Sequence, residues 1–583
     1  MTNAQQPSAQ AGGVKDTIES ILIAFILAFV FRAYIVEAFV IPTGSMAPTL
    51  MGAHMRFHCP DCGYTFDVNY TQPGSGDDVD IPKFAEFKVP VTYNGRPVFD
   101  NNGNQVLKVV PKTFNIRCPN CGFRIGDEEH SEEQDTPPVV TDPPVHYGDR
   151  ILVLKYEYLF KQPDRWDVVV FKSPDPTEGK SPSEYDYSVN FIKRLVGRPG
   201  ESVMVVDGDV YIAKNAGLEL SDYKIQTKPY SVQQALWRLI YDDDFHPRGL
   251  QRFTGQPWRQ PWTQESGSAD WDLGSTPADG RTFKFNHADG MGQMYFDPQA
   301  NPFVDAEGVP HQHTFTDWLA YDITGYEQNR RQNTFNSEVD GSFNPTSDLK
   351  LQLVYDRQSG DGPLSLSLTK IDHTFRAELT PSGAKLFMRV GTGDEKQIGN
   401  TWTANIAKPW RIEFANVDYH VSLRINDKEV ISSTPADYAP DLPMLVRAYN
   451  LGQSMPLPAV RITAANQTCA LSHVSLWRDV YYINRGVLRA TPEDFPRNVV
   501  HLNHSSGKDE YFCMGDNSYV SEDGRYWRSA VDLPGEDLEA PAGVVPERFL
   551  LGKAFFVYWP AGFRPTSSAP GVIPNFGEMR FIH

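Results

Sequence analysis

The chain has 583 residues, which is too long for one hydrophobic core, so we expect about two to four domains. Its net charge of -19 offers no basic surface for phosphates, which argues against a nucleic-acid partner. With 44 glycines, 45 prolines and 12% aromatic residues, the composition favours a folded protein rich in strands and turns.

An apolar segment near the N-terminus could cross a membrane. Residues 1–17 are small and polar and are expected to be disordered, whereas residues 18–40 approach the roughly 20 residues that a spanning helix needs. Arg32 can extend its charge to a membrane surface. We therefore expect an uncleaved transmembrane anchor over residues 18–40. A buried soluble helix and a cleaved signal peptide are the alternatives, although the weakly basic start fits a signal peptide poorly.

The stretch IPTGSMAPTL, residues 41–50, follows this apolar run directly. Its prolines exclude a helix and a central strand, and Gly44 suits a tight turn that presents the Ser45 hydroxyl. A serine in a turn means little alone. Its place beside a membrane segment, and a lysine far downstream, make Ser45 a candidate nucleophile.

Two CPxCG segments, residues 59–63 and 118–122, come next. Each forms a tight loop whose N–H groups can bond thiolates, and together they offer four soft ligands for tetrahedral zinc. We predict a zinc-ribbon-like unit over residues 54–126 that binds structural zinc through Cys59, Cys62, Cys118 and Cys121. One or two disulfides are the alternative, which an extracytoplasmic location would favour.

After an acidic, proline-rich linker at residues 127–144, the pattern predicts strands over residues 147–155, 166–171 and 189–196, the last of which contains Lys193. A hairpin follows at residues 203–212. These strands, with the similar segment 483–583, predict one domain with mixed β-sheets.

Residues 215–482 differ in character. From Leu349 onward, strands with period-two alternation come at short spacing, which is typical of a β-sandwich. The closing stretch, residues 474–482, loosely resembles the last strand of concanavalin A-like jelly rolls. That resemblance implies a glycan or protein contact, but a purely architectural insert is an equal alternative.

Ser45, Lys193 and Ser521 are candidates for one catalytic site. A serine hydroxyl needs a base, and a lysine can serve when burial keeps it neutral, which means destabilising its cation by roughly 3 kcal/mol. Lys193 lies in an apolar strand, as this requires. An outward-facing lysine on an edge strand is the alternative.

The ordered motifs IPTGSMAPTL, YGDRILV, NFIKRLVGRPGE and GDNSYVSEDGRYW, behind the anchor, resemble the boxes of bacterial type I signal peptidases. The resemblance covers about residues 18–50, 145–212 and 500–560. It implies that Ser45 is the nucleophile and Lys193 the general base. It further implies that the Thr43 hydroxyl joins the Ser45 N–H in the oxyanion hole and that Ser521 orients the lysine amine.

The same resemblance assigns structural and substrate-facing roles. Asp516, Asp523 and Arg525 match structural salt-bridge residues, Arg194 follows the lysine as expected, and Met46 would lie near substrate and membrane. Two departures, Gly524 and Arg528, affect local packing rather than chemistry.

The prediction is a mainly β protein: a signal-peptidase-type catalytic domain behind one transmembrane helix, with two inserts. The catalytic domain comprises residues 41–53, 145–214 and 483–583; the zinc-ribbon-like unit comprises 54–126 and the sandwich 215–482.

The resemblance implies a serine endopeptidase of the cell membrane, with its catalytic domain extracytoplasmic, that removes signal peptides after Ala-x-Ala-like sites. Its expected partners are preprotein signal peptides, the lipid bilayer and the export machinery, with no catalytic cofactor. The alternative is an inactive scaffold whose sandwich binds glycan or protein. A repressor-type self-cleaving protease would need a DNA-binding domain, and a zinc protease would need an HExxH motif, which is absent.

Overall fold

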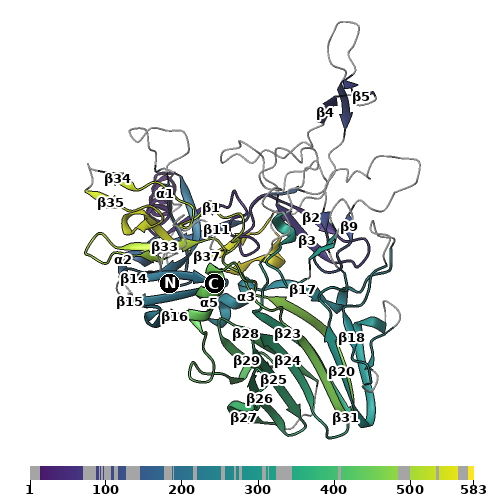
Figure 1. Cartoon of the computed structure of the whole chain (residues 1–583). Helices are drawn as coiled ribbons and strands as arrows, with labels where there is room; N and C mark the ends of the chain where they lie inside the picture. Colours follow the sequence, from purple (N-terminus) through teal and green to yellow (C-terminus); the bar gives the residue numbers. More distant parts are fainter. Residues whose placement is uncertain are drawn as a thin grey trace, which may run out of the picture.

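The computed structural model shows a mainly β chain with two large parts (Figure 1). One part carries the N-terminal helix and the C-terminal strands, and the other is a broad sandwich of long strands. The structure describes residues 14–69, 87–90, 92–93, 96–97, 107–110, 116–125, 145–175, 187, 189–214, 219–250, 257–267, 271–274, 279–301, 303–304, 310–312, 314–322, 344–404, 409–483, 499–533, 537–561 and 575–583. The predicted linker, residues 127–144, lies outside these ranges.

The N-terminal helix α1 (Val14–Tyr34) begins earlier and ends earlier than the predicted segment 18–40. Its successor β1 (Val36–Val40) is a strand, because its backbone pairs with β11 (Arg150–Leu154) instead of continuing the helix. Among the described residues, no helix combines the length and the apolar character that a membrane span requires.

An eight-stranded sheet forms the frame of the first part. Lys193 lies on an interior strand of this sheet, between β12 and β33. In spatial order the strands are β1, β11, β37 (Leu550–Trp559), β12 (Val168–Lys172), β13 (Asn190–Gly197), β33 (Glu510–Met514) and β36 (Val545–Pro546), with β38 (Arg580–Phe581) beside β37.

A second, four-stranded sheet extends this part: β16 (Lys224–Ile225), β15 (Asp209–Lys214), β14 (Glu201–Val206) and β32 (Val499–His501). Since β16 pairs with β15, the first part continues past residue 214, where the sandwich was predicted to begin. The predicted mixed sheets are wrong: every strand pair among the described residues is antiparallel. Hairpins and long insertions connect these strands, so no helical crossover is needed.

The sandwich is built around β31 (Val460–Arg478), a 19-residue strand that pairs with β17, β20, β23 and β24. Alternate residues point inward, as β24 shows by burying Leu364, Leu366 and Leu368 between half-buried polar residues. The other strands are β17 (Arg238–Asp242), β18 (Trp262–Gln264), β19 (Trp271–Asp272), β20 (Thr282–Phe296), β23 (Leu349–Ser359), β24 (Leu364–Lys370), β25 (His373–Thr380), β26 (Gly383–Val390), β27 (Lys396–Thr403), β28 (Trp410–Val417), β29 (His420–Ile425) and β30 (Lys428–Ser432).

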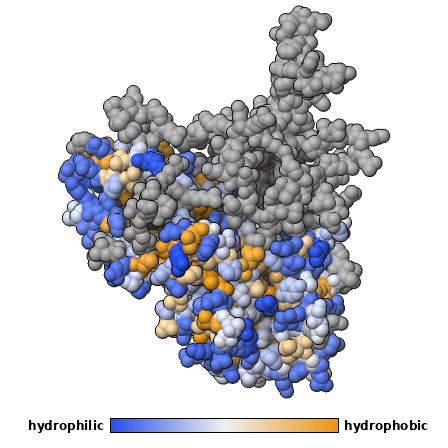
Figure 2. Space-filling model, viewed as in Figure 1, coloured by the Kyte–Doolittle hydropathy of each residue, from blue (hydrophilic) through white to orange (hydrophobic). Residues whose placement is uncertain are grey.

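The face of the sandwich drawn in Figure 2 is mainly hydrophilic, with scattered apolar residues.

Short elements complete the fold. The cysteine-rich unit contributes β2 (His54–His58), β3 (Thr65–Asn69), β8 (Ile116–Arg117) and β9 (Arg124–Ile125), and β10 (Val145–His146) pairs with β2. The remaining elements are α2 (Glu157–Phe160), α3 (Tyr230–Leu236), α5 (Leu442–Asn450), β4 (Phe87–Pro90), β5 (Thr92–Tyr93), β6 (Arg96–Pro97), β7 (Leu107–Val110), β21 (Phe303–Val304), β22 (Pro310–Gln312), β34 (Val531–Leu533), β35 (Leu538–Ala540) and the 3-10 turns η2 (Leu220–Asp222), η3 (Asp243–Phe245), η4 (Asp279–Arg281), η5 (Ala320–Asp322), η7 (Glu547–Phe549) and η8 (Phe576–Glu578).

Buried ion pairs join the two large parts. Lys370 of the sandwich contacts Asp348 on its own side and Asp209 of β15 at 3.3 Å. The Lys370 ammonium also lies 4.1 Å from the centre of the Tyr419 ring. Because its side chain is 1% exposed, these partners must replace the lost hydration of the charge.

We predict that Lys370→Met lowers the free energy of unfolding of the sandwich by about 3–5 kcal/mol, because two buried carboxylates lose their cation. Urea unfolding followed by tryptophan fluorescence measures this change. Lys396→Met, at an exposed position of β27, is the matched control and should change little. Equal effects of the two substitutions would contradict the prediction.

Candidate active site

Ser45 lies in a turn between β1 and β2. The Ala47 N–H donates to the Gly44 carbonyl at 3.0 Å and the Leu50 N–H to that of Met46 at 2.9 Å, which closes the chain around the serine. Ser45 is 9% exposed. Met46, which was expected to face substrate, is fully buried beside Ile41 and Leu50 in the core behind the turn, so it is not available for that contact.

Lys193 reaches this serine from the middle of β13. Its Nζ donates a hydrogen bond to the Ser45 Oγ over 2.8 Å, and its side chain is 4% exposed. Burial lowers the pKa of Lys193 to about 8, although the nearby Asp523 carboxylate opposes the shift. The structure therefore brings a hydroxyl and a readily deprotonated amine together from positions 148 residues apart.

The neighbouring Arg194 points to the other face of β13. Its Nε and Nη2 each donate to one oxygen of Asp516 over 2.7 Å, and both side chains are fully buried. The Nη1 donates to the carbonyls of Trp166 and His583. This bidentate pair fixes the loop after β33 against the strand that carries Lys193.

Asp523 and Arg525 form a second buried pair, with Nε–Oδ1 and Nη2–Oδ2 distances of 2.8 and 2.7 Å. Burial alone would raise the pKa of Asp523, but the Arg525 charge and the hydrogen bonds hold it below its usual value. Its Oδ2 also accepts from the Gly515 N–H at 2.8 Å. Thus Asp523 helps to shape the turn beside Ser45.

Two predicted site residues, Ser521 and Thr43, take no part in the serine–lysine hydrogen bond. Ser521 is 2% exposed, but its hydroxyl has no hydrogen-bond partner among the described residues, so the implied bond to Lys193 is not made. It lies against Gly515, where a methyl group would come within 2.2 Å of the Ser521 Oγ and 2.4 Å of the Ser45 carbonyl oxygen. Thr43 is exposed at the rim of the turn.

Asn517 is a site residue that the sequence reading missed. Its N–H donates to the Ser45 carbonyl at 3.1 Å and its Nδ2 to the Gly44 carbonyl at 3.2 Å. Its place between Asp516 and Ser518 in the last motif was the one available signal. Tyr321 was also missed: a methyl group on Gly44 would come within 2.4 Å of its ring.

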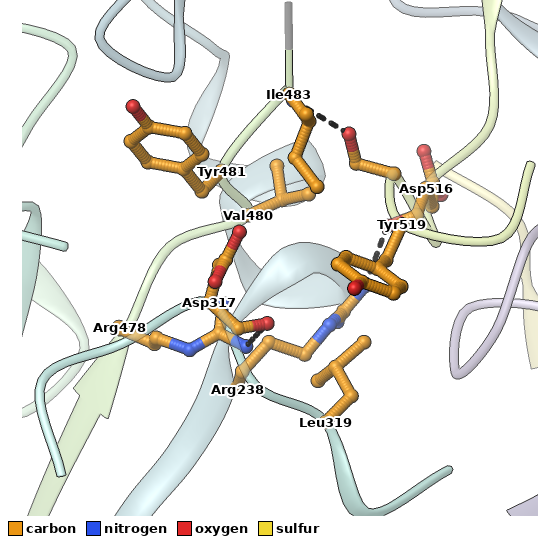
Figure 3. Close-up of a pocket in the computed structure, with 10 residues that line it drawn as sticks. Arg238, Asp317, Leu319, Arg478, Val480, Tyr481, Ile483, Asp516 and Tyr519 are labelled. Atoms are coloured by element: carbon orange, nitrogen blue, oxygen red, sulfur yellow. Dashed lines mark hydrogen bonds between the residues drawn. The ribbon is translucent and has the colours of Figure 1, made fainter. Parts of the chain in front are cut away.

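A small pocket lies close to these loops, where the sandwich side meets the first part (Figure 3). Arg238, from β17, and Arg478, from β31, line it beside Asp317 and Leu319. The loop residues Asp516, Ser518 and Tyr519 close the opposite side. Arg478 donates to the carbonyls of Asp317 and Trp318, each at 2.9 Å, which fixes that segment.

The four cysteines of the CPxCG segments converge. Their Sγ atoms all lie within 4.8 Å of one another, and all four are buried. The Cys59–Cys121 and Cys62–Cys118 sulfur distances are 3.7 and 3.6 Å, far longer than a disulfide bond. Ligands around tetrahedral zinc would lie about 3.8 Å apart, given a Zn–S bond of about 2.3 Å, so this donor set fits zinc.

The knuckle glycines explain how the sequence builds this arrangement. Gly63 and Gly122 have positive φ angles of 81° and 72°, which only glycine adopts easily. Each donates to the carbonyl of the first cysteine in its motif at 2.9 Å. Neighbouring thiols that hydrogen-bond to Cys59 hold its pKa well below the usual value.

Curated proteins match part of the chain. It is 33% identical over 105 residues to "Thylakoidal processing peptidase 1, chloroplastic" from Arabidopsis thaliana, which covers 18% of this chain and 30% of that protein. It is 38% identical over 87 residues to "Signal peptidase I" from Leptolyngbya laminosa, covering 15% and 40%. The chain thus matches well under half the length of these relatives.

Solved structures resemble the chain only weakly. A carbohydrate binding module from Bacillus subtilis shares 10% identity over 37% of this chain and 95% of its own, with a TM-score of 0.21. At that score the likeness carries no argument about function.

The family model "Signal peptidase, peptidase S26" matches residues 138–247 and 479–559. These segments contain Lys193, Arg194, Asp516 and Ser521, whereas Ser45 lies before them. Residues 248–478 separate the two matches. Through these two segments, the chain is similar to the type I signal peptidases of the S26 peptidase family.

Proposed function

We propose that this chain is a serine endopeptidase that removes signal peptides, with Ser45 as nucleophile and Lys193 as general base. One observation carries the proposal: a buried lysine with a pKa near 8 donates to the Ser45 hydroxyl over 2.8 Å. A neutral lysine in this position can accept the serine proton, as nucleophilic catalysis requires.

The reaction would proceed in two halves. Lys193 takes the proton as the Ser45 Oγ attacks the scissile carbonyl, and it then passes that proton to the departing amine of the mature protein. Lys193 next activates a water that hydrolyses the ester left on Ser45. We assign the Ser45 N–H and the Thr43 hydroxyl to the oxyanion, because both belong to the turn that presents the Ser45 hydroxyl.

The substrate and the location are also proposals. The names of the relatives, signal peptidases, support signal peptides as substrates, and we extend this to cleavage after small residues in Ala-x-Ala-like sites. We propose that α1 associates with a membrane, with the catalytic domain extracytoplasmic and near the export machinery. The support is its exposed apolar side chains: Ile18, Ile21, Leu22, Ile23, Phe25, Ile26, Leu27, Phe29 and Val30.

We propose a structural role for zinc. Cys59, Cys62, Cys118 and Cys121 would hold it, and four thiolates leave no position open for a substrate or water. The ion would supply no step of peptide hydrolysis. It would instead stabilise the cysteine-rich unit. In this unit the Asp61 carboxylate accepts hydrogen bonds from the N–H groups of Gly249 and Leu250.

The central prediction concerns the two catalytic residues. Ser45→Ala and Lys193→Met should remain folded, and each should lower the turnover rate at least about a thousandfold, because nucleophile and base act as a unit. Cleavage of a model preprotein in detergent, followed by gel and mass spectrometry, measures this. Lys172→Met, exposed on adjacent β12, is the matched control and should retain activity. Turnover by Lys193→Met would exclude the assigned base.

The low pKa of Lys193 predicts a pH dependence. Its ammonium cannot accept a proton, so kcat/KM should rise about tenfold per pH unit below pH 8 and level off above it. Burial also makes the protonated lysine destabilising in the folded state. Lys193→Met should therefore raise the free energy of unfolding at pH 7 by up to roughly 3 kcal/mol. This gain should shrink as the pH rises from about 8 to 10.5. A flat rate profile would contradict the assignment.

The zinc proposal predicts one zinc ion per chain by elemental analysis. Cys62→Ser should lose this ion, and its thermal midpoint should be lower than that of wild type. Cys469→Ser, at a buried cysteine outside the cluster, is the control and should keep the metal. A chelator that abolishes turnover while the cysteine-rich unit stays folded would contradict a purely structural ion.

A further inference from the structure

A turn from the region between the two family matches packs on the nucleophile loop. This turn, η5 (Ala320–Asp322), lies more than 70 residues after the first matched segment, 138–247. Tyr321 is 4% exposed and forms a small apolar cluster with Ala47 and Met51. Its ring fills the space behind Gly44, so the backbone next to Ser45 is in direct contact with this turn.

The next residue, Asp322, continues the contact through Asn517. The Asn517 Nδ2 donates to the Asp322 Oδ1 over 2.6 Å as well as to the Gly44 carbonyl over 3.2 Å. The Asn517 N–H meanwhile holds the Ser45 carbonyl at 3.1 Å. The amide of Asn517 thus connects the carboxylate of Asp322 to the peptide that precedes the nucleophile.

That peptide contains the N–H assigned to the oxyanion. Because a trans peptide is planar, the Gly44 C=O and the Ser45 N–H point in opposite directions. A hydrogen bond that fixes the carbonyl therefore also fixes the direction of the N–H. Preorganised donors stabilise developing charge without a further reorganisation cost, so a fixed direction has catalytic value.

Hydrogen bonds from the sandwich fix the segment that precedes η5. Arg478, 3% exposed on β31, donates to two carbonyls just before it, those of Asp317 and Trp318. The Asp317 carboxylate accepts from the backbone and side chain of Asn344 at 2.8 and 2.7 Å. Arg478 and Asp317, both drawn in Figure 3, thus hold the segment just before η5, and both lie outside the family-matched segments.

We infer that Asp322 is a positioning residue for peptide hydrolysis: through Asn517 it orients the Gly44–Ser45 peptide and so aims the oxyanion donor. The inference rests on the proposed function for its catalytic consequence. It gives the turn η5, which lies between the two family-matched segments, a part in positioning the catalytic groups.

Two substitutions at one position separate positioning from packing. Asp322→Leu keeps the branched four-atom shape of the side chain and removes the acceptor, whereas Asp322→Asn keeps an oxygen that can accept from Asn517. Asp441→Leu is the stability control, because it removes the N-cap of α5. The Asp441 carboxylate accepts a hydrogen bond from the Met444 N–H at 3.0 Å. All three are made in the full chain and assayed on the same preprotein.

We expect Asp322→Leu to lower kcat about tenfold to a hundredfold with KM within about twofold of wild type. Asp322→Asn should stay within about threefold, and Asp441→Leu should lower the thermal midpoint alone. Unchanged kcat in Asp322→Leu, or equal losses in both Asp322 variants, would overturn the inference.

Hydrogen exchange separates this inference from the proposed function. Asp322→Leu should speed exchange of the Ser45 amide, measured by mass spectrometry with fragmentation, while Asp322→Asn should not. This result holds even if wild type cleaves no preprotein, in which case the proposed function alone fails. Unchanged exchange in Asp322→Leu would overturn the positioning role whether or not the enzyme is active.

Discussion

The hydrogen bond between Lys193 and Ser45 depends on keeping a lysine out of water. An exposed lysine is protonated at neutral pH and cannot accept a proton, so the amine must lie in a poorly solvated place. An interior strand of the eight-stranded sheet provides that place, with β12 on one side and β33 on the other. Burying a cation is unfavourable, and that unfavourable energy is what lowers the pKa of Lys193 to about 8.

Two buried ion pairs hold the surrounding loops in place. Arg194–Asp516 and Asp523–Arg525 are both fully buried, and each is bidentate. Paired charges of this kind do not need water, whereas a single unpaired one would. They fix the turns around the lysine, and within the second pair Asp523 raises the pKa of Lys193 whereas Arg525 lowers it.

Local patterns in the sequence predicted the chemistry better than the packing. The ordered motifs indicated Ser45 and Lys193, and the repeated CPxCG spacing indicated a four-cysteine cluster, which the structure draws together. Alternation of apolar and polar residues predicted a mainly β chain. The side chain of Met46 was misplaced, since a motif does not tell which way each of its residues points.

Contacts between distant segments could not be predicted. Asn517 and Gly44 are 473 residues apart, and Asn517 and Asp322 are 195 apart, so no periodicity or spacing relates them. The strand β1 was included in the predicted anchor, residues 18–40, because four of its five residues continue the apolar run before it. Its pairing with β11, more than 100 residues later, decides its conformation.

The most direct test of this account is the pKa of Lys193 in the folded protein, measured by NMR on ¹³C-labelled lysine side chains. We predict a resonance that titrates near pH 8 and disappears in Lys193→Met. Lys350, whose pKa burial also lowers to about 8, is the second signal to assign, through Lys350→Met. If no resonance lost in Lys193→Met titrates below about pH 10, the lysine is an ordinary cation and the serine–lysine mechanism does not apply.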